Sequence, residues 1–231
     1  MIQRFLQRVV RSLPRRYRLR ARTELDLRNG TVDVELRRLR EYLPTTRRRA
    51  ALDIGANNGV TTSLLSRVFA HVHAFEPNPT LVREWFDVAP ANVTAWPYAL
   101  SDRNGDATLN VPSIGNVALT GWASLGEPGL EKADRIDSVA VPCRRLDSLG
   151  LEELPVDFIK IDVEGHELAV LKGGTTSILR WRPWIMIEAW EPQQGAILHL
   201  FEQWQYETFS LSDALGLQVA SHNLVLRPKN S

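Results

Sequence analysis

The most informative part of the chain is the run Ala51-Leu52-Asp53-Ile54-Gly55-Ala56-Asn57-Asn58-Gly59, which is followed by His73-Ala74-Phe75-Glu76-Pro77. The pattern predicts an apolar strand over residues 50–54, a glycine-rich turn, a helix, and a second strand that ends in a carboxylate. In a parallel α/β sheet the ends of two such strands lie side by side. Gly55 and Gly59 lack a Cβ and would let the backbone approach a ligand closely. Glu76 could accept hydrogen bonds from both hydroxyls of a ribose, so the sequence predicts a nucleoside-cofactor site.

The spacing of the glycine turn indicates which nucleoside cofactor fits it best. Dinucleotide folds carry G-x-G-x-x-G, with a helix N-terminus aimed at a pyrophosphate. Here the order is Asp53-x-Gly55-x-x-x-Gly59, and the carboxylate at the strand end would repel an anion and attract a cation. S-adenosylmethionine combines adenine, ribose and a cationic tail, so it is the cofactor that we expect. The alternative is that the run is only a junction between a strand and a helix.

Several further motifs resemble those of one known family. The run from Asp157 to Glu167, D-F-I-K-I-D-V-E-G-H-E, and the following Leu171-Lys172-Gly173-Gly174 resemble the signature of the FkbM family of S-adenosylmethionine-dependent methyltransferases. The other segments similar to that family are its cofactor loop at 53–59, its ribose-binding turn at Glu76-Pro77-Asn78, its adenine-side turn at Ala99-Leu100-Ser101-Asp102, and Arg145-Leu146-Asp147-Ser148-Leu149. The resemblance covers residues 50–227 and depends on the motifs occurring together in this order.

The resemblance implies a Rossmann-like class I methyltransferase fold of the α/β class. We expect a mostly parallel twisted sheet with helices on both faces and an antiparallel C-terminal edge strand. The expected contacts with the cofactor are Asp53, Gly55, Ala56, Asn57, Gly59, Glu76, Pro77, Ser101 and Asp102. The third strand is expected over residues 93–100, and residues 101–150 interrupt the alternation as an insertion that could cover the cofactor or shape the acceptor pocket.

Chemistry is expected where Asp162, Glu164 and His166 emerge from a buried strand, because ligands bind at the carboxyl ends of strands in such sheets. An alcohol is a poor nucleophile until a base removes its proton, and His166 has a suitable intrinsic pKa for that role. Asp162 or Glu164 would orient its imidazole. Alternatively, these three residues and Glu188 could bind a divalent metal ion such as Mg²⁺ or Mn²⁺.

Composition is that of one globular domain. The chain has 231 residues, 44% of them hydrophobic, and a single cysteine, Cys143. A single cysteine excludes an internal disulfide and fits a reducing compartment. No apolar run approaches the roughly 20 residues needed to span a bilayer, and Arg4, Arg8 and Arg11 interrupt any secretory signal. We therefore expect a cytoplasmic protein.

Charge divides the chain into an arginine-rich extension, residues 1–49, and a methyltransferase domain, residues 50–231. The extension holds 15 arginines against five acids, a balance of +10, and the remainder holds 13 basic against 22 acidic residues, a balance of −9. One helical stripe in the extension is apolar: Ile2, Phe5, Leu6, Val9, Val10 and Leu13. We expect it to pack on the domain or on a second subunit of a homodimer, although it could also lie on an anionic membrane surface. A second helix is expected over residues 32–43, with Thr31 as its N-cap.

Three functional classes follow from these observations. The first is an O-methyltransferase that acts on a hydroxyl of a small molecule, a sugar or a secondary metabolite. The second is a methyltransferase that esterifies a carboxylate, which needs no strong base. The third is a non-catalytic adaptor whose basic extension docks an acidic partner. Nucleic acid is not an expected partner, because the basic segment is separate from the acidic domain. Trp181, Trp184 and Trp190 are interpreted as core and pocket wall.

Overall fold

The structure is a computed structural model, and it describes residues 9–10, 12–115, 117–126, 133–151, 153–216 and 222–229. Within the expected N-terminal stripe, Ile2, Phe5 and Leu6 lie outside the described residues, whereas Val9 is exposed and Val10 and Leu13 are half-buried. The packing of that stripe, the homodimer and the membrane contact therefore stay predictions. Among the helices of the described ranges, none has the length and apolar character that crossing a bilayer would require.

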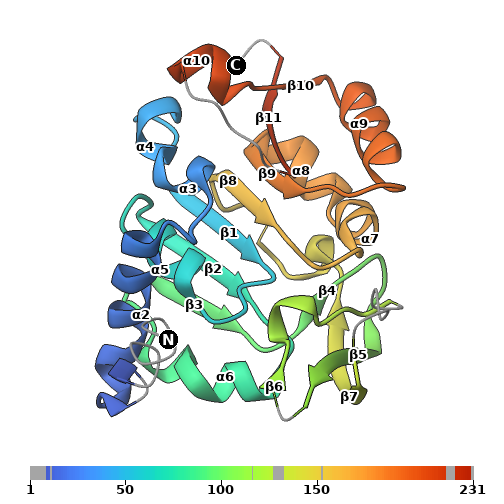
Figure 1. Cartoon of the computed structure of the whole chain (residues 1–231). Helices are drawn as coiled ribbons and strands as arrows, with labels where there is room; N and C mark the ends of the chain where they lie inside the picture. Colours follow the sequence, from blue (N-terminus) through green and yellow to red (C-terminus); the bar gives the residue numbers. More distant parts are fainter. Residues whose placement is uncertain are drawn as a thin grey trace.

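A seven-stranded, mostly parallel sheet forms the centre of the molecule (Figure 1). In sheet order its strands are β10 (Tyr206–Thr208), β11 (Asn223–Pro228), β9 (Trp184–Glu188), β8 (Val156–Ile161), β1 (Ala50–Ile54), β2 (His71–Phe75) and β3 (Val93–Trp96). The strands from β9 to β3 run parallel, and β11 is antiparallel to both of its neighbours. The chain moves outward from β1 to β3 and then returns to β8 on the other side of β1. This reversal places a crevice at the carboxyl ends of β1 and β8.

The expected α/β fold is thus confirmed, with one difference at the end of the sheet. The antiparallel strand β11 lies between β9 and β10, so the edge of the sheet is β10. The connection from β10 to β11 also contains a helix, α10 (Leu211–Leu215).

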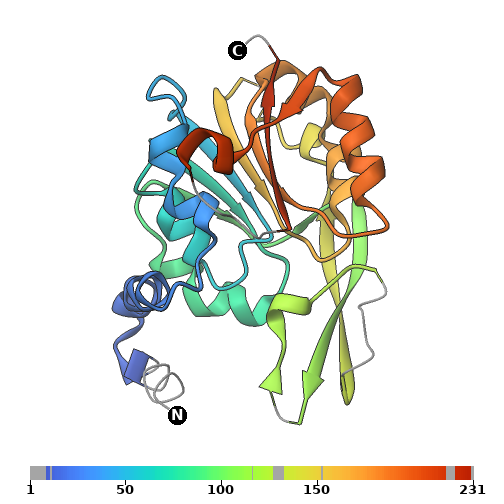
Figure 2. The same cartoon turned by 45° about the horizontal axis from the view of Figure 1, so that its top comes forward.

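Helices cover both faces of the sheet, because alternate strand residues point to opposite sides. On β8, Ile159 and Ile161 pack into one apolar cluster and Phe158 packs into another. The first face is covered by α7 (Glu167–Gly173), α8 (Thr175–Trp181) and α9 (Gln194–Gln203); the second is covered by α3 (Val34–Arg37), α4 (Leu39–Tyr42), α5 (Val60–Leu65) and α10 (Figures 1 and 2). The two layers bury the sheet between them.

The N-terminal segment differs from its prediction in two respects. The helix expected over residues 32–43 is divided into α3 and α4, which meet at Arg38, and Asp33 replaces Thr31 as the residue before the first helical turn. A long helix that the sequence did not predict, α2 (Arg15–Asn29), packs against α5 and α6 (Pro79–Trp85). Its only buried residues are Leu19 and Thr23, so it lacks the wide apolar stripe by which a surface helix is recognised.

The expected insertion contributes three strands to a second sheet of four, which lies beside the carboxyl ends of β1, β2 and β3 (Figures 1 and 2). Its strands, in sheet order, are β4 (Ala99–Leu100), β7 (Arg135–Arg144), β5 (Gly105–Ile114) and β6 (Val117–Ala118). The third strand expected over residues 93–100 is therefore divided. Pro97 follows β3 directly and has no N–H to donate to a sheet, so β4 begins beyond it in the other sheet.

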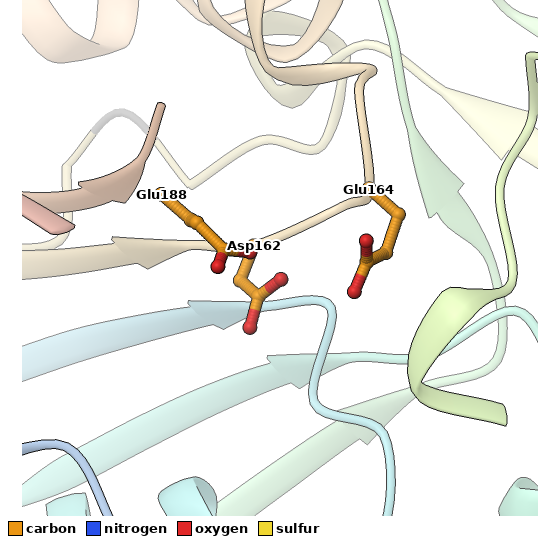
Figure 3. A group of neighbouring side chains, drawn as sticks. All are labelled: Asp162, Glu164 and Glu188. Atoms are coloured by element: carbon orange, nitrogen blue, oxygen red, sulfur yellow. The ribbon is translucent and has the colours of Figure 1, made fainter. Parts of the chain in front are cut away.

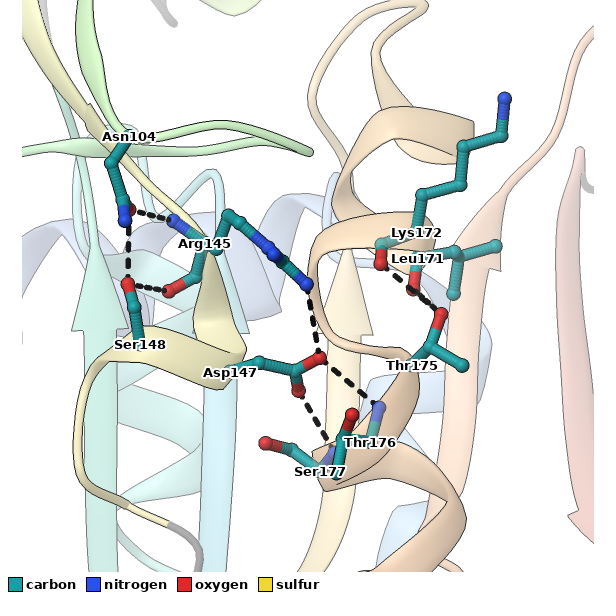
Figure 4. A network of polar contacts seen from close by, with 9 residues as sticks. All are labelled: Asn104, Arg145, Asp147, Ser148, Leu171, Lys172, Thr175, Thr176 and Ser177. Carbon is teal, nitrogen blue, oxygen red and sulfur yellow. Dashed lines mark hydrogen bonds and ion pairs between the residues drawn. The ribbon is translucent and has the colours of Figure 1, made fainter.

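A network of polar contacts shows that the Arg145-Leu146-Asp147-Ser148-Leu149 motif has a role in packing (Figure 4). The Asp147 carboxylate accepts hydrogen bonds from the backbone N–H groups of Thr176 and Ser177, at 3.1 and 2.9 Å, and so caps the first turn of α8. Asn104 Oδ1 accepts hydrogen bonds from the N–H of Arg145 and the hydroxyl of Ser148, at 2.8 and 2.9 Å. The segment Arg145–Leu149 thereby ties the end of β7 to α8 and to the turn after Asp102.

The double glycine at the end of α7 has a steric cause. A Cβ on Gly173 would lie 1.9 Å from the carbonyl oxygen of Ser101, and a Cβ on Gly174 would lie 2.8 Å from Leu146. The helix can therefore approach the Ser101-Asp102 turn only because Gly173 carries no side chain, and Gly174 leaves room for Leu146.

We expect Gly173→Ala to lower the free energy of unfolding by about 1–3 kcal/mol, as overpacking does in well-packed interiors. Gly195 provides a matched control, since it also lies in a helix, α9, and a Cβ there would meet nothing within 4 Å. Gly195→Ala should leave stability unchanged or raise it by up to about 1 kcal/mol, because alanine is the better helix former. Urea unfolding of both variants would measure the difference, and equal midpoints would contradict the steric explanation.

Candidate functional site

A partly enclosed cavity lies at the carboxyl ends of β1, β2 and β8. Its floor and walls come from the main sheet and the loops that follow the strands, namely Ile54, Gly55, Asn57, Phe75, Glu76, Pro77, Asp162, Val163, Glu164 and His166, with Tyr98, Ala99 and Leu100. Its roof comes from the insertion, namely Leu109, Thr120, Gly121, Ala123 and Leu125. The insertion therefore covers the cavity, and whether it covers a cofactor there or shapes an acceptor pocket stays a prediction.

The glycines of the first turn are required by neighbouring protein atoms. Gly55 has a φ of +85°, and a Cβ there would lie 1.8 Å from the carbonyl oxygen of Asp162. Gly59 has a φ of +79°, and a Cβ there would lie 2.8 Å from the ring of Trp85. Both features exclude a side chain before any ligand is considered. The explanation expected from the sequence for Gly55 and Gly59 is the close approach of a ligand. The contacts within the protein are enough to explain both glycines.

The Glu76 side chain is held in the cavity by backbone N–H groups of two turns, the glycine turn after β1 and the turn after β2. Its Oε2 accepts a hydrogen bond from the N–H of Asn57 at 2.7 Å, and its Oε1 accepts one from the N–H of Asn78 at 2.8 Å. Burial raises the pKa of this carboxyl to about 7, although the two N–H donors oppose the shift. Each oxygen keeps a free lone pair. Glu76 is thus a preoriented acceptor of hydrogen bonds at the end of β2.

Asp53 does not line the cavity, although it lies directly before the glycine turn. Its side chain is fully buried, and its Oδ2 accepts a hydrogen bond from the hydroxyl of Thr62 at 2.6 Å. Burial raises the pKa of this carboxyl, and the charge of Lys160 opposes the shift. Asp53 therefore faces the interior beside α5, and its direct contact with a cofactor stays a prediction.

Lys160 is a buried cation that the sequence analysis missed. It pairs with Asp53 across the β1–β8 register, and its Nζ lies 2.7 Å from Oδ2 of Asp162. Burial alone would lower the pKa of Lys160, but the charges of Asp162 and Asp53 outweigh it and raise the pKa. The signal was present in the sequence, because a lysine inside the apolar strand Phe158–Ile161 has to find a partner.

The loop after β8 is held in an unusual backbone conformation. Glu164 has a φ of +51°, a region that residues with a side chain rarely adopt. Oε1 of Glu167 accepts hydrogen bonds from the N–H groups of Val163 and Gly165, at 3.3 and 3.1 Å. The hydroxyl of Ser124, in the insertion, donates to the carbonyl of Glu164 at 2.7 Å. Sequence reasoning missed Ser124 and Glu167, which support the loop and do not line the cavity.

Three carboxylates meet beside this loop: Asp162, Glu164 and Glu188 (Figure 3). One oxygen from each lies within 4.8 Å of the others. Burial and the neighbouring charges of Asp162, Glu188 and Glu167 raise the pKa of Glu164 to about 8. Burial and the charge of Asp162 raise the pKa of Glu188 to about 7. The cluster therefore favours a proton or a cation at neutral pH.

His166 lies apart from these carboxylates, on the other side of the loop. Its Nε2 lies 2.8 Å from the hydroxyl of Ser101. Burial lowers the pKa of His166, the charge of Asp102 opposes that shift, and Arg103 adds to it. The nearby carboxylate is thus Asp102, where Asp162 or Glu164 was expected. The reason is the left-handed turn at Glu164 and Gly165, which separates the side chains before and after it.

Comparisons with known proteins agree with the motifs. The sequence model described as the methyltransferase FkbM domain matches residues 53–208. The chain is 32% identical over 132 residues to the hexuronic acid methyltransferase AglP of Haloferax volcanii, which covers 54% of this chain and 50% of that protein. It is also 32% identical over 147 residues to the 2-O-methyltransferase NoeI of Sinorhizobium fredii, which covers 57% of this chain and 59% of that protein. The chain spans little more than half the length of these curated relatives.

A solved structure of the same description is more distant. The crystal structure of the methyltransferase FkbM from Methylobacillus flagellatus superposes with a TM-score of 0.49 and 15% identity, over 78% of this chain and 43% of that one. The family match, by contrast, extends over more than half of this chain and includes both the glycine turn and the D-V-E-G-H-E loop. This chain belongs to the FkbM family of S-adenosylmethionine-dependent methyltransferases.

Proposed function

We propose that this protein uses S-adenosylmethionine to methylate a hydroxyl of a sugar or a related polyhydroxylated small molecule. The observation that carries the proposal is the shared cavity, which is lined by the fixed carboxylate of Glu76 and by Asp162 and Glu164, two members of the carboxylate cluster. The names of the two curated relatives, a hexuronic acid methyltransferase and a 2-O-methyltransferase, support a sugar as acceptor.

The residues that line the cavity fit the parts of this cofactor. Glu76 would accept hydrogen bonds from the ribose, with Asn57 and Pro77 beside it. Ser101 and Asp102 do not themselves line the cavity, but Ser101 contacts His166, which does, and the two residues remain the proposed adenine contacts. Gly55 and Asp162 line the other side, where a cationic tail would find the carboxylates. When bound, the cofactor supplies an electrophilic methyl group on a sulfonium sulfur.

Glu164 is the base that we propose for the acceptor hydroxyl. It lines the cavity and belongs to the carboxylate cluster. Its pKa of about 8 is close to neutral pH, as the pKa of a general base should be. Its rare φ is a further mark of a functional position. His166, the base expected from the sequence, also lines the cavity and remains the second candidate. Its ring, however, is engaged with Ser101 on the proposed adenine side.

Three other functions would use the same cavity. They are an ester-forming methyltransferase, a metal-dependent methyltransferase and a non-catalytic adaptor. A carboxylate acceptor would need no base, because the nucleophile is already ionised. A divalent metal ion would find three oxygen ligands in Asp162, Glu164 and Glu188, whereas His166 is not part of that cluster. Lys160 already neutralises Asp162 at 2.7 Å, so we favour a mechanism without a metal ion. A non-catalytic adaptor is the least supported of the three, because the lining residues of the motifs are intact.

Replacing Glu76 should weaken binding of S-adenosylmethionine. Glu76→Gln keeps the size of the side chain but removes the charge, and a charge-assisted hydrogen bond is worth about 1.5–3 kcal/mol, or about 10- to 100-fold in affinity. Wild-type affinity should also fall as the pH drops below about 7, because a proton then competes for the Glu76 carboxylate. Isothermal titration would measure both effects.

Asn78→Ala is the matched control for this experiment. Its side chain caps α6 through the N–H of Thr80 at 3.0 Å, so the variant disturbs the same turn and leaves the carboxylate in place. Its affinity for the cofactor should stay near that of the wild type. Equal losses in the two variants would show that Glu76 only supports the turn.

Two variants should separate the candidate bases. Glu164→Gln should lower kcat about 100-fold or more, within the usual contribution of a general base, and His166→Gln should lower it far less. A base acts when deprotonated, so the wild-type rate should fall as the pH drops through about 8, the pKa of Glu164 in the free enzyme. His166→Gln should keep this pH profile. The opposite pattern would assign the base to His166, and near-full activity in both variants would indicate a carboxylate acceptor.

Removal of divalent ions should leave turnover unchanged. We expect equal rates after dialysis against a chelator and after addition of Mg²⁺ or Mn²⁺, because Lys160 supplies the positive charge that Asp162 needs. Lys160→Met, tested in the same way, shows whether a metal ion can take over that charge. Turnover that is lost in chelator and restored by a divalent ion would establish the metal-dependent mechanism.

A further inference from the structure

Trp190 is exposed at the rim of the carboxylate cluster, although tryptophan is usually covered in a folded protein. Half of its surface, 50%, is accessible to solvent, whereas Trp85, Trp184 and Trp204 are buried. It follows Glu188 by two residues at the end of β9, and its side chain is close enough to that carboxyl to oppose the rise of the Glu188 pKa. The ring thus lies next to the residues proposed to act on the acceptor.

The exposed ring is held in place on two sides. It stacks on the imidazole of His222, with ring centroids 3.5 Å apart and an angle of 24° between the planes. The backbone carbonyl of Trp190 accepts hydrogen bonds from the N–H groups of Gln193 and Gln194, at 2.9 and 3.0 Å. The Gln193 side chain in turn donates to the carbonyl of Gly165 at 2.6 Å. Trp190 is therefore coupled to the loop that carries Glu164.

Core packing does not explain this arrangement. An indole that served only to fill the interior would be covered, since each exposed apolar ring forgoes the free energy of burial. The interpretation of Trp190 from the sequence, as core and pocket wall, is wrong in its first part. A rigid, exposed aromatic face beside hydrogen-bonding carboxylates is instead the arrangement that suits a ligand with one apolar face and several hydroxyls.

We propose that Trp190 is the platform on which the ring of a neutral sugar acceptor stacks, while Glu188 accepts hydrogen bonds from its hydroxyls. This inference rests on the proposed function and assigns the acceptor subsite within it. A pyranose presents axial C–H groups on one face, which pack on an aromatic ring, and its hydroxyls lie at the edge, where carboxylate oxygens can accept their hydrogen bonds.

The negative charge of the carboxylate cluster determines which sugars can bind at this subsite. Asp162, Glu164 and Glu188 lie within 4.8 Å of one another, and the cation that contacts this cluster is Lys160, which is paired with Asp162. A sugar that carries a carboxylate would bring a fourth acid to the cluster, and like charges at this distance repel. A neutral glycoside is therefore the better acceptor, in contrast to the hexuronic acid in the name of one relative.

The test uses the full chain with S-adenosylhomocysteine bound, and neutral methyl glycopyranosides as probes, with the matching methyl glucuronide as the charged comparison. The variants are Trp190→Ala, Trp190→Phe, which keeps an aromatic face, and Tyr17→Ala. Tyr17 is the control because it is equally exposed, at 49%, on the distant helix α2. Saturation-transfer NMR would report which sugar protons contact the protein, and isothermal titration would report affinity for the cofactor.

We expect the wild type to saturate the protons of one sugar face and to bind the neutral glycoside more tightly than the glucuronide. Trp190→Ala should weaken glycoside binding at least tenfold and leave cofactor affinity unchanged, Trp190→Phe should retain most of the binding, and Tyr17→Ala should retain all of it. A measurement of turnover with the glycoside that binds most tightly should show a matching rise, at least tenfold, in the KM of Trp190→Ala for that acceptor.

Three results would overturn the inference. Equal glycoside binding by the wild type and Trp190→Ala, or no binding of any glycoside by the wild type, would remove Trp190 from the acceptor subsite. Tighter binding of the glucuronide would overturn the preference for a neutral sugar. Failure of the proposed function looks different, because cofactor binding or methyl transfer would then be absent while the contact between glycoside and Trp190 could still be observed.

Discussion

The buried ion pair between Lys160 and Asp162 is the interaction on which the rest of the site depends. A cation at the centre of a parallel sheet is tolerated only with partners, and here the partners lie on the same strand and on the neighbouring strand β1. Removing Lys160 would leave Asp53 and Asp162 as buried charges without compensation. Lys160 also faces Asp53 across the register, so its charge links β8 to β1, and Gly55 allows the two backbones to approach as closely as they do.

The insertion completes the cavity through a few polar contacts. Ser124 holds the carbonyl of Glu164, and the hydroxyl of Thr120 lies 3.4 Å from the side-chain oxygen of Asn57. Both contacts join the roof to loops of the main sheet, one on each side of the cavity. The roof is thus attached to the same two loops that the family motifs define, so the shape of the cavity follows from those loops and the insertion together.

Much of the fold could be predicted from the sequence, because its strands are apolar runs that end in recognisable turns. The strand at 50–54, the turn at Gly55 and the carboxylate at Glu76 all lie where the pattern placed them. Long-range contacts were harder to predict. Nothing in the local sequence shows that Asp53 turns inward to Thr62, or that His166 reaches Ser101 and not Glu164, since both depend on how separate segments pack. Helix α2 was missed because its exposed arginines conceal a narrow buried edge.

Helix α7 touches the Ser101 turn at both of its ends, through His166 before its first residue and through Gly173 at its last. A short helix clamped in this way cannot slide or rotate without breaking one of the two contacts. Residues 101–102 and α7 are thus held to each other at two points, and Asp147 adds a cap on the next helix, α8. The roof, by contrast, is joined to the loops of the main sheet through the hydrogen bonds of Ser124 and Thr120. His166, which does line the cavity, is consequently tied to a turn that is anchored at a second point, and that packing sets its position.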